Sequence, residues 1–174
     1  MAEPVLVYFD SCVFIELLQR DDKDRTEACD YLMGLAEKKE LVIVTSTVAI
    51  TEVNKLPESS ALPEEQSKKI LAAFQRSYFK PRPVTRAVAE LAHELTRTHG
   101  LKNLDAIHVA TALLSRVSVL YTYDGPKQRR RGILRHHLSI GSPPLRIEMP
   151  PAPPVEPLYK GTGDYGETPP TSDE

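Results

Sequence analysis

Residues 5–19 read VLVYFDSCVFIELLQ. The first five residues are apolar or aromatic, which is typical of a strand covered on both faces, and an aspartate follows directly at position 10. A second apolar run begins after Ser11, the expected N-cap of a helix from about Cys12 to Arg20. Since a buried charge is costly unless it is paired or bound to a metal, Asp10 at this junction indicates a site.

The same order of strand and helix repeats along the chain. Further strands are expected at 41–45, 118–124 and 144–150, and a short edge segment broken by prolines at 78–85. Helices are expected at 26–40, 46–56, 64–76, 86–100 and 104–116, the last of them capped by Asn103. This alternation favours right-handed crossovers and a parallel sheet between helical layers, an α/β fold that binds ligands at the carboxyl ends of its strands.

The chain of 174 residues suits one domain, expected at 1–149, followed by a tail at 150–174. The tail holds seven of the 15 prolines and has five acidic residues against one basic residue, a net charge of −4. Because the whole chain has a net charge of −2, residues 1–149 have +2. Such a Pro-rich acidic segment buries too little apolar surface to offset its ordering entropy, so it is expected to be disordered.

Several classes of protein are excluded by what the sequence lacks. No apolar run approaches the roughly 20 residues that cross a membrane, and no basic region precedes the first apolar run as in a signal peptide. The two cysteines, Cys12 and Cys29, have no CxxC or Cys/His spacing, so a structural zinc site is not expected. Reduced thiols and a cytoplasmic location are the plain interpretation.

Four acidic residues stand in apolar surroundings: Asp10, Glu52, Asp105 and Asp124. Asp10 and Asp124 end predicted strands and Asp105 opens a helix, so all three are expected at one edge of the sheet. Glu52 lies six residues after Ser46, roughly 9 Å along a helix, and its long side chain can reach back toward that edge.

Carboxylates gathered in this way repel one another unless something neutralises them. Mg²⁺ and Mn²⁺ prefer oxygen ligands, and an acidic cluster that holds such ions is suited to phosphodiester hydrolysis because the metal activates water and stabilises the leaving oxygen. In this hypothesis Asp10, Asp105 and Asp124 ligate the first metal directly or through water. Glu52 completes the cluster and holds a water molecule or a second metal.

Each acid also has a structural explanation. Asp10 can be a helix N-cap, Glu52 a surface residue, Asp105 an acid that favours the helix dipole, and Asp124 a turn residue before Gly125. The order strand-Asp, helix-Glu, helix-Asp, strand-Asp is more specific than any one member.

The stretches YFDSCVFIELL, VTSTVAITEV, LDAIHVATAL and LYTYD carry a family resemblance. In this order, within residues 5–124, they resemble the PIN-domain family, and in particular its VapC-like toxin ribonucleases. The resemblance implies a three-layer α/β/α sandwich and a Mg²⁺- or Mn²⁺-dependent endoribonuclease that leaves 5′-phosphate and 3′-hydroxyl ends. It implies that the acidic quartet is Asp10, Glu52, Asp105 and Asp124, and that Ser11 and Thr122 orient ligands or water. An antitoxin protein and a second copy of the chain are the candidate partners.

A basic run directly follows Asp124, and its members are expected to contact the RNA backbone: Lys127, Arg129, Arg130, Arg131 and Arg135. The alternative is a solvated loop, which most charge runs are. His108 lies one turn after Asp105, and we interpret it as a hydrogen-bonded histidine of a buried helix rather than as a site residue.

Other functions fit the pattern less well. A non-catalytic PIN-like module that binds RNA or protein is the main alternative, although an intact acidic quartet argues against it. The phosphatase pattern D-x-D-x-T fails because Cys12 occupies the position of the second aspartate. A phospho-accepting receiver needs an aspartate at the end of a middle strand, and the strand at 41–45 has none.

Overall fold

The computed structural model describes residues 3–53, 64–125 and 132–154. Within these residues, one sheet has five strands, and every neighbouring pair is parallel. In order across the sheet, the strands are β3 (Phe79–Arg82), β2 (Leu41–Ser46), β1 (Val5–Phe9), β4 (Val119–Tyr121) and β5 (Ile147–Glu148).

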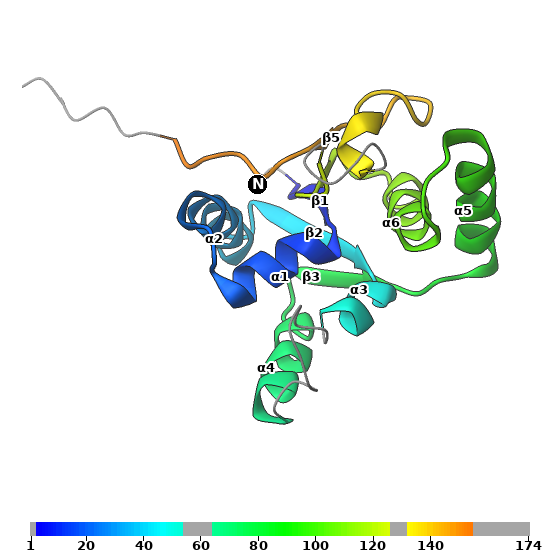
Figure 1. Ribbon diagram of the computed structural model, residues 1–174. Coiled ribbons are helices and arrows are strands. Elements are labelled where there is room, and N and C mark those ends of the chain that lie inside the picture. The colour runs from blue at the N-terminus through cyan, green and yellow to red at the C-terminus, as the bar shows by residue number, and fades with distance from the viewer. Residues whose placement is uncertain (1–2, 54–63, 126–131, 155–174) are drawn as a thin grey trace, which may run out of the picture.

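Helices cover both faces of this sheet (Figure 1). One face packs against α1 (Ser11–Gln19), α2 (Lys23–Glu37), α3 (Thr47–Glu52) and α4 (Glu64–Phe74). The other face packs against α5 (Arg86–His99), α6 (Asn103–Leu114) and the short 3₁₀ helix η1 (Ile133–His136). The predicted three-layer α/β/α sandwich with a central parallel sheet is confirmed.

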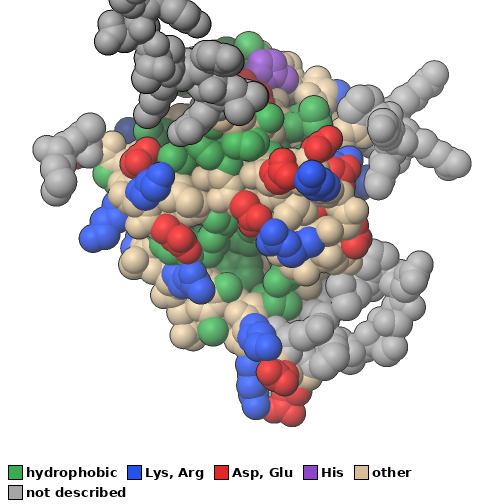
Figure 2. Space-filling model, turned by 90° about the vertical axis from the view of Figure 1, so that its left-hand side faces the viewer, with side chains coloured by type: hydrophobic (Ala, Val, Ile, Leu, Met, Phe, Trp, Pro, Cys, Tyr) green, Lys and Arg blue, Asp and Glu red, His purple; other side chains and the backbone are tan. Residues whose placement is uncertain are grey.

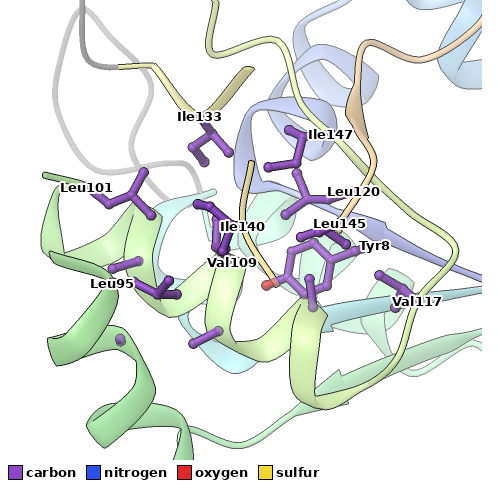
Figure 3. Close-up of a cluster of buried hydrophobic side chains, with 14 of the residues drawn as sticks. Tyr8, Leu95, Leu101, Val109, Val117, Leu120, Ile133, Ile140, Leu145 and Ile147 are labelled. Atoms are coloured by element: carbon purple, nitrogen blue, oxygen red, sulfur yellow. The ribbon is translucent and has the colours of Figure 1, made fainter. Parts of the chain in front are cut away.

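The central strands are mostly apolar because they contribute to two hydrophobic cores. Val7 and Phe9 of β1 belong to the core under α1, α2 and α4, whereas Tyr8 points into the core under α5 and α6. Figure 3 shows this second core, in which Tyr8 and Leu120 of the sheet lie among side chains of the helical layer. Period-two alternation with both faces buried produces the uninterrupted apolar runs seen in the sequence.

The predicted edge segment with prolines is confirmed as β3. It pairs with β2 on one side only, and Pro81 lies opposite Thr45 in the register. In a central strand, successive N–H groups donate to the neighbours on opposite sides, so a proline there would lose a bond to one of them. An edge strand has a neighbour on one side only and can hold a proline, which explains why this strand lies at the edge.

Three predicted helix starts are wrong. Asp10, rather than Ser11, is the N-cap of α1, and its carboxylate accepts the Ser11 N–H at 2.7 Å. The helix α2 begins at Lys23 rather than at 26, because Asp22 caps it. The helix α6 begins at Asn103 after Lys102, without a side-chain cap, so Asn103 is not its cap. At α1, the adjacent Asp and Ser have nearly equal capping preferences, so sequence alone does not choose between them. At α6, the N-cap position is held by Lys102, which is not a capping residue, so no capping preference marks that start.

The C-terminal tail extends past the described part of the chain. Residues 150–154 form no helix or strand, and 155–174 lie outside the described residues, so the disorder of 150–174 and the domain boundary at 149 stay predictions. None of the described helices is long and apolar enough to cross a membrane.

Candidate active site

The order of the strands creates a crevice between β1 and β4. From β1 the sheet extends outward through β2 and β3, and the chain then returns to place β4 on the other side of β1. Asp10 follows β1 directly, and Asp124 follows β4 after two residues. In open parallel sheets, ligands bind where the strand order reverses in this way, beyond the carboxyl ends of the strands.

A cleft of about 490 Å³ opens at this point. Asp10, Asp105 and Asp124 all line it, although they come from the end of β1, the first turn of α6 and the segment after β4. Arg25 and Lys102 also line the cleft and are its basic members among the described residues. The structure therefore brings together three of the four predicted acids.

Asp10 is the most firmly held of these acids. It is only 4% exposed, and its Oδ1 accepts the N–H of Ser11 at 2.7 Å. Its Oδ2 accepts the hydroxyl of Thr122 at 2.7 Å and lies 3.2 Å from the Cys12 sulfur. The buried carboxylate has its partners in place, so its position is fixed before any ligand arrives. Capping α1 and lining the cleft are thus compatible roles for one residue.

Thr122 connects two of the acids. Its hydroxyl donates to Asp10 and accepts the backbone N–H of Asp124 at 3.0 Å. The side chain is fully buried, and Ser11 contacts the same Asp10 carboxylate through its hydroxyl at 3.4 Å as well as through its N–H. These contacts place both predicted hydroxyl residues directly beside the acids.

Asp105 stands apart because one of its carboxylate oxygens, Oδ2, is buried without a hydrogen-bond partner among the described residues. Burial, followed by the charges of Asp124 and Asp10, raises the pKa of Asp105 from its ordinary value of 3.8 to about 6. An unpaired buried oxygen next to two other carboxylates is an arrangement that a cation would relieve.

Glu52 lies beside the cleft rather than in its lining. Its Oε2 is 2.7 Å from Nε2 of His108, a buried residue of α6, and the same nitrogen is 3.5 Å from Oδ1 of Asp10. Sequence reasoning did not include His108 in the site. Burial by itself disfavours the charged imidazole, but Asp10, Glu52 and Asp105 together outweigh it and raise the pKa of His108.

Asp124 is held by the segment that returns toward it after the basic run. Its Oδ2 accepts the N–H of Ile133 at 3.3 Å, and its carbonyl oxygen accepts the N–H of Leu134 at 3.2 Å. The intervening residues 126–131, which include the predicted RNA contacts Lys127, Arg129, Arg130 and Arg131, lie outside the described residues. The described chain therefore contacts Asp124 again at Ile133 and Leu134.

Arg135, the last member of the basic run, is directed elsewhere. Its guanidinium donates to the backbone carbonyl of His99 at 3.0 Å and to the ring of His136 at 2.8 Å. These contacts join η1 to the end of α5, so Arg135 has a structural role in holding these two helices together. An RNA contact by Arg135 stays a prediction.

Gly132 permits the close return of the chain to Asp124. A Cβ atom at this position would stand 2.6 Å from the carbonyl oxygen of Asp124, a backbone atom. We therefore expect Gly132→Ala to destabilise the fold by about 1–3 kcal/mol, the usual cost of overpacking. Gly34→Ala is the matched control, because its Cβ would meet nothing within 4 Å and alanine favours the helix α2. Urea unfolding of the two variants measures both effects, and equal stability would contradict the close approach.

The donors of this site suit a hard cation. The three predicted acids in the lining, Asp10, Asp105 and Asp124, offer oxygen only, as Mg²⁺ and Mn²⁺ prefer, and Oδ2 of Asp105 has no hydrogen-bond partner among the described residues that an ion would have to displace. In the described part of the chain, no three His, Cys, Asp or Glu side chains lie close enough together to hold a metal ion as they stand. Carboxylates that repel one another are expected to stand apart until a cation draws them together.

The comparisons with known proteins decide the family. The family model of the PIN domain matches residues 7–131. The chain belongs to the PIN domain family. No curated protein matches the chain significantly. Membership in this family supports a nuclease, that is, a hydrolase.

Two solved structures share the PIN fold of this chain. One is VapC20 of Mycobacterium tuberculosis, described as a toxin that cleaves the sarcin–ricin loop, with 18% identity and a TM-score of 0.53 over 68% of this chain and 90% of that chain. The other is VapBC2 of Rickettsia felis bound to a DNA fragment from its promoter, with 17% identity and a TM-score of 0.54 over 83% of this chain and 98% of that one. At these identities the likeness establishes the fold.

Proposed function

We propose that this PIN-domain protein is a metal-dependent endoribonuclease, the toxin of a toxin–antitoxin pair. The observation that carries the proposal is the convergence of Asp10, Asp105 and Asp124 on one cleft at the point where the strand order reverses. Family membership and the fold shared with VapC20 support the same conclusion. Cys12 and Cys29 are free thiols, which supports the cytoplasmic location that we propose.

Asp10, Asp105 and Asp124 are the residues of the cleft that would hold Mg²⁺ or Mn²⁺. When bound, such an ion lowers the pKa of a coordinated water and stabilises the charge that develops on the phosphate and the leaving oxygen. Thr122 and Ser11 orient the Asp10 carboxylate toward this site through their hydrogen bonds. Glu52 is the fourth acid, held against His108 next to Asp10.

RNA is the substrate we propose, and the basic groups around the cleft support it. Lys102 lies three residues before Asp105, and Arg25 lines the same cleft, with its guanidinium 4.8 Å above the ring of Tyr123. The predicted RNA contacts Lys127, Arg129, Arg130 and Arg131 lie outside the described residues, and the described chain that follows them contacts Asp124 through the N–H groups of Ile133 and Leu134. Positive groups next to an acidic cleft attract the phosphates on either side of the bond to be cleaved.

A protein partner is proposed for a second surface. An apolar groove of about 190 Å³ lies between α1, α2 and α4, and it is lined by Phe14, Leu17, Leu18, Met33 and Phe74 among others. Figure 2 shows hydrophobic side chains around a hollow on this face, with charged side chains at its sides. Because Ile15 and Gln19 of the same helix α1 line the acidic cleft, an antitoxin bound in the groove would stand next to the site it must block.

A second copy of the chain is the other partner that the family resemblance implies. We propose a homodimer on that ground, and light scattering coupled to size-exclusion chromatography distinguishes it from a monomer.

Removing the metal tests the proposed function. Purified protein is expected to cleave single-stranded RNA in Mn²⁺ and to lose this activity in excess chelator, because the acids alone cannot neutralise the phosphate. Mapping of the product ends is expected to show 5′-phosphate and 3′-hydroxyl groups.

Binding in chelator identifies the alternative function. If the protein shifts RNA in a native gel run in chelator, and does not cleave the same RNA in Mn²⁺, the nuclease proposal is contradicted and a non-catalytic binding module is favoured. Cleavage that persists unchanged in chelator would contradict the role of the metal.

A further inference from the structure

His108 is the polar residue that connects the acidic residues behind the cleft. It lies on α6, three residues after Asp105, and is only 1% exposed. Both of its ring nitrogens have partners: Nδ1 is 2.7 Å from the hydroxyl of Tyr8, and Nε2 is 2.7 Å from Oε2 of Glu52. The imidazole thus joins α6 to β1 and to α3.

The hydrogen-bond pattern assigns the hydrogen on Nε2. The carboxylate of Glu52 can only accept, so Nε2 of His108, 2.7 Å away, is the donor of that pair. The hydroxyl of Tyr8 accepts the backbone N–H of Ser46 at 2.9 Å and can donate its own hydrogen to Nδ1 of His108. A neutral imidazole with an accepting Nδ1 carries its hydrogen on Nε2, facing Glu52. A charged imidazole carries a hydrogen there as well, so the bond to Glu52 is present in either state.

The same nitrogen also faces Asp10, whose Oδ1 is 3.5 Å away. His108 therefore stands between two carboxylates that would otherwise repel each other at close range. A buried polar ring is costly unless both of its nitrogens are satisfied, and here Tyr8 and Glu52 satisfy them. Tyr8 is itself fixed, because its ring is fully buried in the core shown in Figure 3. Its hydroxyl also accepts the N–H of Ser46, the N-cap of the helix α3 that carries Glu52.

We propose that His108 is a positioning residue that fixes Glu52 beside Asp10 and thereby sets the geometry of the acids for the metal. This inference rests on the proposed function. Without the Nε2–H group, the Glu52 carboxylate loses its partner and is free to turn, because 23% of its side chain is exposed. Groups that orient metal-binding residues in this way typically change metal affinity or activity by about 10- to 100-fold when they are removed.

Two amide substitutions separate positioning from packing. His108→Gln places an N–H group near the position of Nε2 and keeps the bond to Glu52, whereas His108→Asn reaches only the position of Nδ1 and keeps the bond to Tyr8. Calorimetric titration of the full chain with Mn²⁺ is expected to give a dissociation constant within about threefold of wild type for the glutamine variant. The asparagine variant is expected to bind about 10-fold more weakly or worse.

The measurement is made below the melting temperature of each variant, so that loss of stability does not change the affinity of the folded protein. Equal Mn²⁺ affinity of the two variants, or no Mn²⁺ binding by wild type, would overturn the positioning role. RNA cleavage by wild type is measured in parallel. A wild type that binds Mn²⁺ without cleaving RNA contradicts the nuclease proposal, while a difference between the two variants still supports the role of His108.

Discussion

Asp10→Asn is expected to reduce RNA cleavage by about 100- to 1,000-fold, because the metal is expected to supply several kcal/mol of charge stabilisation and each 1.36 kcal/mol is a factor of ten in rate. The substitution removes one negative charge from the centre of the site and keeps the shape of the side chain. The amide oxygen can still accept the Ser11 N–H, so α1 keeps its cap. Initial rates on single-stranded RNA in Mn²⁺ measure the effect.

Asp30→Asn is the matched control for this prediction. Asp30 is a half-exposed residue of α2 whose carboxylate pairs with Arg20 at 2.7 Å, away from the lining of the cleft. Exposed pairs of this kind contribute little to stability, so this variant should fold and cleave RNA like wild type. Full activity of Asp10→Asn, with normal folding by circular dichroism, would refute the catalytic site.

The sheet could be predicted because its signal is local. Strands β1, β2 and β4 are covered on both faces, and such strands appear in the sequence as short apolar runs. Aspartates at the ends of two of these runs indicated a site at the carboxyl-terminal edge of the sheet, whereas the position of β4 beside β1 is known only from the structure. The helix starts could not be placed to the residue, because Asp10 and Ser11 are both good caps and the choice depends on the path of the chain.

The contacts of His108 could not be predicted from spacing. Its partners Tyr8 and Glu52 lie 100 and 56 residues away, and only the folded chain brings them together. A weak signal was present nonetheless: a histidine on the same face as Asp105 in an otherwise apolar helix needs partners for both of its nitrogens. Glu52 was the matching acid on a second apolar helix, and such a residue needs a partner as well.

Asp105→Asn is expected to stabilise the metal-free protein at pH 7.5 while abolishing the response to Mn²⁺. The pKa of Asp105 in the folded protein, about 6, lies above its ordinary value of 3.8. The folded state therefore binds the proton of the Asp105 carboxyl more tightly than the unfolded state does. Protonated Asp105 stabilises the fold fully below about pH 4, and this contribution is lost as the pH rises through 6. A pKa difference of about two corresponds to ~2.7 kcal/mol, which solvent screening of a partly buried group reduces to about 1 kcal/mol.

Urea unfolding of wild type and Asp105→Asn at several pH values, with and without Mn²⁺, tests this prediction. Other acids titrate in both proteins, so the difference between the two free energies of unfolding isolates Asp105. Without metal, that difference should favour the variant at pH 7.5 and shrink as the pH falls below 6. Saturating Mn²⁺ should reverse it, because an ion at 100 times its dissociation constant adds ~2.7 kcal/mol to wild type alone. If the variant is less stable than wild type in chelator at pH 7.5, the negative charge of Asp105 does not destabilise the metal-free protein and the prediction is wrong.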